Sequence, residues 1–412
     1  MPEDTSYVIV GASLAGAKAA ETLRAEGFTG PVALVGTENE LPYERPPLSK
    51  DYLLGKAERD SIYVHPRQWY ADNDIDLRTG VTVTGIDRAA RAVTLADGSR
   101  IGYGKLLLTT GSSPLSLSVG GADSGGVLYL RTAADSDRLK AAFTAGARIA
   151  VIGAGWIGLE AAAAARQAGA EVTVIEAAEL PLLRVLGPET AAVFAALHRD
   201  HGVDLRFNAE VIAIVSEAGR VTGVSLADGR TVPADAVVVG IGIAPSVDLA
   251  ERAGLKIDNG IRVDAGLCSS DPHIYAAGDV ASAYHPVLGK HIRVEHWANA
   301  LNQGPAAARS MLGQDIAYDR VPYFYTDQYD LGMEYSGYVE PGGYDRVVFR
   351  GEVAGREFIA FWLDAADRVL AGMNVNVWDV TEPIQALVRA GRPVDAAALA
   401  DPSVDLGSLG GS

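Results

Sequence analysis

Cysteine is almost absent from this sequence, because Cys268 is the only one among 412 residues. A single cysteine can form neither an internal disulfide nor a CxxC redox pair. Any two-electron chemistry must therefore proceed without a protein dithiol, which argues against a disulfide reductase. We expect Cys268 itself to be a small, partly buried residue near a strand.

The sequence also lacks an apolar run long enough to span a bilayer, and its N-terminal segment has no signal-type pattern. We therefore expect a cytoplasmic protein. Basic residues are outnumbered, with 35 Lys and Arg against 52 Asp and Glu, which gives a formal net charge of −17. This charge argues against nucleic acid or a membrane surface as a partner.

The sequence does contain two glycine-rich turns, Gly11–Gly16 and Gly153–Gly158. Each follows a short apolar run and opens an alanine-rich stretch that we expect to be helical. This order is typical of the phosphate-binding turn of a βαβ unit. The two turns lie roughly one domain length apart, so they indicate two dinucleotides bound by one polypeptide.

The flanking segments repeat in the same order and predict a duplicated fold. The predicted elements of the first copy are strands Tyr7–Val10, Val32–Val35, Val81–Val83, Ala92–Leu95 and Leu106–Leu108, with a helix at Ala15–Ala25. Those of the second copy are strands Ile149–Ile152, Glu171–Ile175, Val224–Leu226 and Ala236–Val239, with a helix that begins near Ile157. The C-terminal part predicts strands Arg346–Phe349 and Glu357–Leu363, a helix Glu382–Ala390, and a frayed tail with Gly407, Gly410 and Gly411.

The fold class is therefore α/β, with two Rossmann-like dinucleotide-binding domains and a C-terminal α+β domain. We place a discontinuous FAD-binding domain at residues 1–112 and 245–319. An NAD-binding domain then covers 113–244, and the C-terminal domain covers 320–412.

In the first turn, Gly11 permits the tight bend and Gly16 permits close packing of helix and strand. Ser13 replaces the middle glycine of the motif, and a pyrophosphate would bind at the helix N-terminus. Glu38 follows the second strand and can accept hydrogen bonds from a ribose. Taken alone, this turn could equally be an ordinary βαβ turn.

The second turn is complete, with Gly153, Gly155 and Gly158. Glu176 ends the next strand, where a carboxylate binds a ribose diol and repels a 2′-phosphate, so NADH is favoured over NADPH. Arg184 weakens this preference unless it faces solvent or the adenine. Later in the chain, Asp279 follows Gly278 after an apolar strand and could accept from a ribityl hydroxyl, although Gly-Asp is also common in simple turns.

Six motifs together resemble the FAD-dependent, NADH-linked ferredoxin reductases of bacterial oxygenase systems, the group of putidaredoxin reductase and the biphenyl-dioxygenase reductases. They are Gly11-x-x-x-x-Gly16, Tyr43-x-Arg45-Pro46-Pro47-Leu48-Ser49-Lys50, Gly153-x-Gly155-x-x-Gly158-x-Glu160, Tyr275-x-x-Gly278-Asp279, Glu295-His296-Trp297 and Asp327-Gln328-Tyr329. The resemblance extends over nearly the whole chain. It departs from the family at Tyr323 and Tyr325, where tryptophans are usual.

The resemblance implies roles for individual residues that the spacing of the motifs alone does not indicate. Lys50 would lie near flavin N5, and Glu160 would meet the nicotinamide carboxamide and pair with Lys50 before NADH binds. Trp297 would cover the pyrimidine side of the flavin. The alternatives are that Lys50 is a solvated loop lysine, that Glu160 is an exposed helix glutamate and that Trp297 is a core tryptophan. The full set assigned to FAD is Gly11, Ser13, Ala15, Gly16, Glu38, Arg45, Pro46, Lys50, Val83, Thr110, Gly111, Arg131, Gly278, Asp279, Glu295, His296 and Trp297. The set assigned to NAD is Gly153, Gly155, Trp156, Ile157, Gly158, Glu160, Glu176, Arg184 and Gly242.

The implied function is an NADH-dependent ferredoxin reductase. It would take a hydride onto FAD and pass single electrons to a [2Fe–2S] ferredoxin that feeds a cytochrome P450 or a Rieske dioxygenase. We expect a monomer or homodimer without a metal site. Arg309, with Lys290 and Arg293, could form a docking patch or could be scattered surface charge. Two other functions stay open, namely an NADH oxidase-like enzyme and a flavin redox sensor similar to apoptosis-inducing factor.

Overall fold

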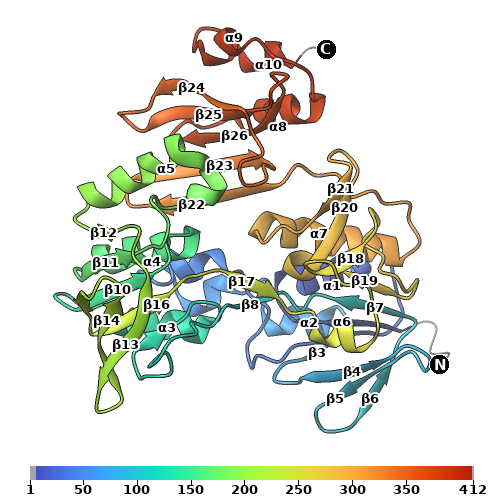
Figure 1. The fold of residues 1–412 in the computed structure, drawn as a ribbon. Coiled ribbons are helices and arrows are strands. Elements are labelled where there is room, and N and C mark those ends of the chain that lie inside the picture. Colours follow the sequence, from blue (N-terminus) through green and yellow to red (C-terminus); the bar gives the residue numbers. More distant parts are fainter. Residues whose placement is uncertain (1–5, 411–412) are drawn as a thin grey trace. The chain divides into compact units, whose positions relative to one another are not determined.

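The computed structural model describes residues 6–410, and these divide into two compact units. Unit 1 comprises residues 6–45, 58–113 and 243–320, and unit 2 comprises residues 46–57, 114–242 and 321–410. Each unit contains a parallel five-stranded sheet, and unit 2 also contains an antiparallel five-stranded sheet (Figure 1). The three-domain boundaries drawn from the sequence remain a prediction.

The sheet of unit 1 is parallel throughout, in the order β3-β2-β1-β7-β19. Its strands are β1 (Tyr7–Val10), β2 (Val32–Val35), β3 (Ile75–Arg78), β7 (Lys105–Leu108) and β19 (Ile274–Ala276). The runs of β1 and β2 are buried along their whole length, as expected of parallel strands covered on both faces. Helix α1 (Leu14–Ala25) connects β1 to β2 and lies against α7 (Trp297–Met311) (Figure 1).

The remaining elements of unit 1 are smaller. They are β4 (Val83–Asp87), β5 (Ala92–Leu95), β6 (Arg100–Gly102), β18 (Ile261–Val263), β20 (Ala281–His285), β21 (Lys290–Ile292), α2 (Arg67–Asp72), α6 (Asp248–Arg252), η3 (Arg59–Ile62) and η4 (Gly278–Val280). The strand predicted at Val81–Val83 was placed too early, because β4 begins at Val83. The Val81 N–H instead donates to the carbonyl of Gly36, outside any ladder.

The sheet of unit 2 repeats this design in the order β12-β11-β10-β16-β9. Its strands are β9 (Val127–Leu128), β10 (Arg148–Ile152), β11 (Glu171–Ile175), β12 (Asp204–Arg206) and β16 (Ala236–Val239). Helix α4 (Trp156–Gln167) connects β10 to β11 as α1 connects β1 to β2. The antiparallel sheet β4-β5-β6 likewise has a counterpart in β13 (Val211–Glu217), β14 (Arg220–Leu226) and β15 (Thr231–Pro233). The predicted duplication of a Rossmann-like fold is confirmed.

Unit 2 also contains η2 (Pro46–Ser49), α3 (Ala133–Ala142), α5 (Leu183–Asp200) and the C-terminal α+β part. Two short strands, β8 (Ser112–Pro114) and β17 (Ile243–Pro245), form a two-stranded sheet. The C-terminal strands are β22 (Tyr323–Gln328), β23 (Leu331–Gly337), β24 (Arg346–Glu352), β25 (Glu357–Leu363) and β26 (Val369–Val375). They form an antiparallel sheet in the order β22-β23-β26-β25-β24, on which α8 (Thr381–Ala390) and α9 (Ala396–Ala400) pack (Figure 1).

The predicted fraying of the tail is wrong for Gly407, which lies inside the short helix α10 (Leu406–Leu409). Asp405 caps this helix, Leu406 is buried in the C-terminal core, and Arg392 donates to the carbonyl of Gly410. Gly411 lies outside the described residues. Across residues 6–410, no helix combines the length and the apolar character that crossing a bilayer requires.

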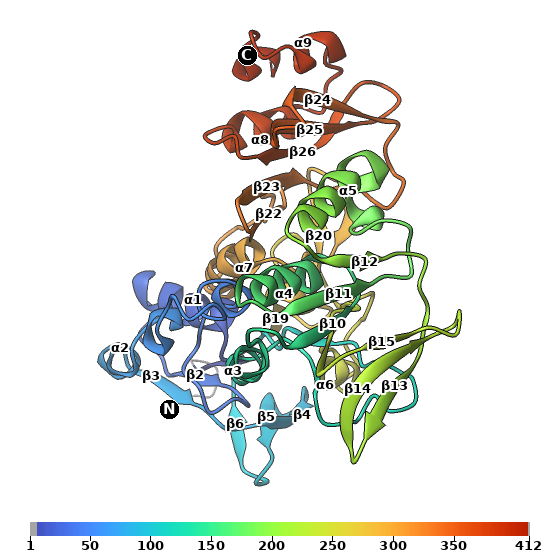
Figure 2. The same cartoon turned by 90° about the vertical axis from the view of Figure 1, so that its left-hand side faces the viewer.

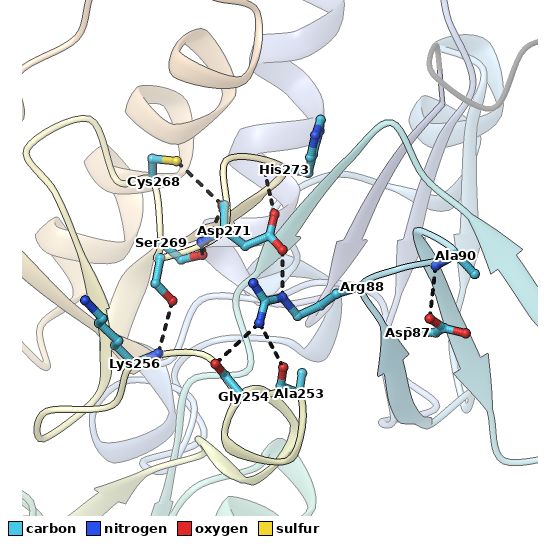
Figure 3. Close-up of polar contacts among 11 residues, drawn as sticks. Asp87, Arg88, Ala90, Ala253, Gly254, Lys256, Cys268, Ser269, Asp271 and His273 are labelled. Atoms are coloured by element: carbon cyan, nitrogen blue, oxygen red, sulfur yellow. Dashed lines mark hydrogen bonds and ion pairs between the residues drawn. The ribbon is translucent and has the colours of Figure 1, made fainter.

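Cys268 lies in unit 1 and forms an isolated bridge with Tyr275 of β19. It is half-buried, and its Sγ lies 3.8 Å from the carbonyl oxygen of Asp271 (Figure 3). Burial raises the pKa of the thiol, and the nearby Asp264 carboxylate acts in the same direction. The thiol therefore has little thiolate character, and the prediction of a small, partly buried residue is confirmed.

Candidate functional site

The residues predicted to bind FAD lie mostly in unit 1, and those predicted to bind NAD lie in unit 2. Unit 1 contains most of the FAD set, namely Gly11, Ser13, Ala15, Gly16, Glu38, Arg45, Val83, Thr110, Gly111, Gly278, Asp279, Glu295, His296 and Trp297. Unit 2 contains the whole NAD set, together with Pro46, Lys50 and Arg131. Pro46 begins η2, and Arg131 directly precedes the capping box of α3 at Thr132.

The first glycine turn is tightly built. Gly11 has φ +118°, and a Cβ added there would overlap the carbonyl of Thr109. A Cβ at Gly16 would overlap the carbonyl of Gly11. Ser13 is the N-cap of α1, but in the described chain its side chain makes no capping hydrogen bond and the first helical turn has no acidic residue. The N–H groups of that turn are thus available to a phosphate.

A second feature of unit 1 also fits a bound polar group. Among residues 6–410, the Ser112 hydroxyl is one of the few buried side-chain groups without a hydrogen-bond partner. Buried hydroxyls normally have a partner. Ser112 follows Gly111, which has φ +67°, and Thr110, whose hydroxyl donates to the carbonyl of Ser246 over 2.9 Å. These residues and the α1 turn fit the pyrophosphate of FAD.

Two carboxylates predicted to bind the FAD sugars are held in place. The Tyr43 hydroxyl donates to Glu38 over 2.6 Å, and the Arg45 guanidinium lies 3.6 Å from the other Glu38 oxygen. Asp279 lies in η4, where the preceding Gly278 N–H donates to Gln303 of α7 over 2.9 Å. Side-chain contacts therefore hold Glu38 after β2, and a backbone hydrogen bond holds the turn that carries Asp279 after β19.

The Glu295-His296-Trp297 motif leads into α7. Glu295 pairs with Arg293, and the Trp297 indole donates to Glu44 over 3.1 Å. Burial lowers the pKa of His296 to about 4, although the Asp279 carboxylate opposes this shift. His296 is therefore neutral at physiological pH. Val83, the remaining FAD residue of this unit, begins β4 and packs against the core of unit 1.

In unit 2 the second glycine turn has the same construction. Gly153 has φ +98°, and an added Cβ would overlap the carbonyl of Gly240. A Cβ at Gly158 would overlap the carbonyl of Gly153. Gly155 is the N-cap of α4, and a Cβ there would have its nearest neighbour at 4.0 Å, which leaves room for a ligand to approach the backbone.

Glu176 lies beside this turn. One carboxylate oxygen accepts from the Ala154 N–H over 2.7 Å and the other from the Ala178 N–H over 2.9 Å. Each oxygen keeps a lone pair for a ribose hydroxyl. Arg184, in the first turn of α5, is exposed. The turn is therefore shaped for a dinucleotide, with a fixed carboxylate at the ribose position.

Three further NAD residues surround the turn. The Trp156 ring meets Phe194 and Phe324 edge-on, with centroid distances of 5.4 and 5.2 Å. The next side chain, Ile157, is 44% exposed at the start of α4. Gly242 has φ +116° directly before β17.

Lys50 and Glu160 form an ion pair in unit 2, with Nζ and Oε1 2.6 Å apart. The side chains are only 15% and 5% exposed. The predicted pairing is thus present in the structure, and the alternatives of a solvated lysine and an exposed glutamate are wrong. The Tyr325 ring, which stands where the family usually has tryptophan, lies 5.5 Å from Lys50 Nζ. Tyr323 instead donates to Glu334 over 2.7 Å.

The sequence did not identify three residues that contact or support Glu160. Ser49 donates to Oε2, Thr326 donates to Oε1 over 2.6 Å, and Gln328 donates to Thr326 over 3.2 Å. Beyond them, His198 of α5 contacts Gln328 over 2.8 Å. Ser49 and Gln328 belong to two of the six family motifs, which implied no role for either residue, whereas His198 belongs to none of them.

The basic cluster considered for docking is not a group of free cations. Arg309 pairs with Glu26 over 2.7 Å, and Arg293 pairs with Glu295. These ion pairs favour scattered surface charge over a basic patch.

Residues 5–304 match the family described as pyridine nucleotide-disulphide oxidoreductase. The chain belongs to this family. As an oxidoreductase of this family with one cysteine, it has no dithiol of its own to reduce. Residues 323–410 match the family described as reductase C-terminal.

Similar proteins refine this membership. The chain is 43% identical to the anthranilate 1,2-dioxygenase system ferredoxin–NAD(+) reductase component of Burkholderia cepacia, over 97% of this chain and 98% of that protein. It is 38% identical to putidaredoxin reductase CamA of Pseudomonas putida, over 98% and 97%. Among solved structures, the covalent putidaredoxin reductase–putidaredoxin complex matches with a TM-score of 0.94 at 38% identity, over 98% of this chain and 97% of that chain. The resemblance to ferredoxin reductases of oxygenase systems, and the predicted fold class, are confirmed.

Proposed function

We propose that this protein is a flavoprotein reductase that takes a hydride from NADH onto FAD and passes single electrons to a [2Fe–2S] ferredoxin that supplies an oxygenase. The observation that carries the proposal is the buried Lys50–Glu160 pair beside a complete dinucleotide turn, in a chain whose relatives are ferredoxin reductases. When bound, FAD accepts two electrons together from a nicotinamide and can release them singly.

The residues of unit 1 would bind and orient FAD. The N-terminus of α1 offers backbone N–H groups to the pyrophosphate, and Ser112 offers an unpaired buried hydroxyl. Glu38 and Asp279 would accept from ribose and ribityl hydroxyls. Charge-assisted hydrogen bonds of this kind are stronger than neutral ones.

The residues of unit 2 would bind the nicotinamide dinucleotide. Glu176 is fixed by two backbone N–H groups, and its negative charge disfavours a 2′-phosphate. Ala177 and Ala178 supply no cation that could attract one. We therefore propose NADH as the preferred donor over NADPH.

Lys50 and Glu160 are the residues we assign to the reacting ends of the cofactors. Glu160, as a carboxylate, can accept from the nicotinamide carboxamide and so fix the ring. The Lys50 cation can stabilise negative charge on a reduced flavin. With Glu160 accepting from the carboxamide, Lys50 would be available for this role.

The electrons are proposed to leave to a ferredoxin because the half-buried thiol of Cys268 is the only one in the chain. An NADH oxidase-like enzyme would pass them to oxygen, and a redox sensor would retain them. We also propose that the protein is cytoplasmic and is a monomer or a homodimer.

The test uses purified holoprotein, NADH and one acceptor at a time. We expect rapid reduction of ferricyanide, slow oxygen uptake, and reduction of cytochrome c that depends on an added [2Fe–2S] ferredoxin. Rapid oxygen uptake without a carrier would contradict the proposal in favour of an oxidase. Slow turnover with every acceptor would favour a sensor.

A further inference from the structure

A row of polar side chains is buried in unit 2 behind the Lys50–Glu160 pair. It runs from Glu160 of α4 through Thr326 and Gln328 of β22 to His198 of α5, and these three elements lie side by side (Figure 2). The residues are 5%, 1%, 1% and 0% exposed. Thr326 and Gln328 are two residues apart on one strand, so both face the same side of the sheet.

Aromatic rings lie beside this row. Trp156 of α4 packs between Phe194 of α5 and Phe324 of β22, so the same three elements also meet through aromatic rings. Replacing a complete set of buried hydrogen-bond partners by apolar groups of the same shape can be neutral for stability. Stability alone therefore does not require a polar row here.

The hydrogen bonds in the row have a single direction. The Glu160 carboxylate can only accept, so the one proton of Thr326 points toward it. Thr326 then accepts from the Gln328 amide, which leaves the Gln328 carbonyl oxygen to accept from His198 Nε2–H. The Tyr329 hydroxyl lies 3.4 Å from His198 Nδ1, which must accept.

The protonation state of His198 agrees with this direction. Burial lowers the pKa of His198 to about 4, although the hydrogen bond with Gln328 opposes the shift. A neutral imidazole has one donor and one acceptor nitrogen, which is what its two partners need. Because an amide does not titrate, Gln328 cannot relay a proton, and the row orients groups rather than conducting protons.

We infer that Thr326, supported by Gln328 and His198, is a positioning residue whose hydroxyl holds the Glu160 carboxylate for the nicotinamide end of the dinucleotide. The inference rests on the proposed function, since it deepens the role given there to Glu160. It adds helix α5 and strand β22 to the elements that determine nicotinamide binding.

The test compares Thr326→Val, which removes the hydroxyl at nearly constant shape, with Thr326→Ser, which keeps it. Isothermal titration of each holoprotein uses NAD⁺ and ADP-ribose, which lacks the nicotinamide. A hydrogen bond to a charged group is lost in Thr326→Val, so we expect its Kd for NAD⁺ to rise about tenfold. The Kd for ADP-ribose should not change, and Thr326→Ser should bind NAD⁺ as the unaltered protein does.

Ser336→Ala is the matched control. Ser336 is a hydroxyl residue that is 2% exposed in the neighbouring strand β23, and it accepts from Gln385 over 3.2 Å, outside the row. Loss of the Ser336 hydroxyl should leave the Kd for NAD⁺ and the Kd for ADP-ribose unchanged. In the unaltered protein, ¹⁵N NMR of His198 should report the neutral Nε2–H tautomer at pH 7.

Three outcomes would overturn the inference. Thr326→Val could weaken NAD⁺ and ADP-ribose equally, it could leave both unchanged, or His198 could carry its proton on Nδ1. Failure of the proposed function looks different: the unaltered protein would then bind neither NAD⁺ nor ADP-ribose, or it would bind both and fail the acceptor assay described under the proposed function.

Discussion

Removing the Lys50 charge should destabilise unit 2 through the carboxylate left behind. In Lys50→Met, Glu160 remains 5% exposed without its cation but keeps the hydroxyl donors Ser49 and Thr326. Breaking a buried ion pair costs roughly 3–5 kcal/mol, and the two remaining donors place this case near the lower end, at about 3 kcal/mol.

The double variant Lys50→Met, Glu160→Gln distinguishes the cost of an unpaired buried charge from the cost of altered packing. Its neutral amide needs no cation, so we expect the double variant to lose only about 1 kcal/mol, a typical cost for weakened hydrogen bonding. The two substitutions would then be clearly non-additive, as expected of residues in direct contact.

The assay is urea unfolding followed by tryptophan fluorescence, with Lys56→Met as the control. Lys56 is an exposed lysine in the same segment, and its loss should change the unfolding free energy by less than about 0.5 kcal/mol. The reasoning is refuted if Lys50→Met is as stable as Lys56→Met, or if the double variant loses more than Lys50→Met alone.

Three further predictions concern other parts of unit 2. In Gly153→Ala, the new Cβ would overlap the Gly240 carbonyl at φ +98°, so NADH binding measured by titration should be lost while FAD is retained; undiminished NADH binding would contradict this. In Glu176→Ala, the ratio of NADH to NADPH affinity should fall about tenfold, equivalent to about 1.4 kcal/mol, and an unchanged ratio would remove Glu176 from the ribose site. His198, with its pKa lowered to about 4, stays neutral in the folded protein while the unfolded chain takes up a proton below about pH 6.5. Its contribution to stability is therefore lost as the pH falls from about 6.5 to about 4. Between pH 7 and pH 5, the free energy of unfolding measured in urea should therefore fall by about 2 kcal/mol less in His198→Asn than in the unaltered protein. An equal fall in both proteins would contradict burial of a neutral histidine.

Much of the fold could be predicted because local rules determine it. Strand β1, helix α1 and strand β2 follow from a buried apolar run, a glycine turn and an alanine-rich stretch. Boundaries that depend on distant partners were less accurate. β4 begins at Val83 because Val81 bonds to Gly36 of another segment, and α10 forms because its cap and Arg392 fix a glycine-rich tail.

The site was only partly predictable for a related reason. Glycine turns and carboxylates at strand ends carry their chemistry in a few consecutive residues. The support of Glu160 comes instead from side chains far away in sequence, since Thr326 is 166 residues from Glu160 and His198 is 130 residues from Gln328. In the sequence, His198 stands in an ordinary amphipathic helix, and only the tertiary structure brings it to Gln328.

The claim that this chain moves a hydride from NADH to FAD is tested most directly by the absorption spectrum of the purified protein before and after anaerobic addition of NADH. We predict a yellow protein whose flavin absorbance bleaches and is replaced by a long-wavelength charge-transfer band. A colourless protein that cannot take up FAD, or a bound flavin that NADH leaves oxidised, would contradict the claim.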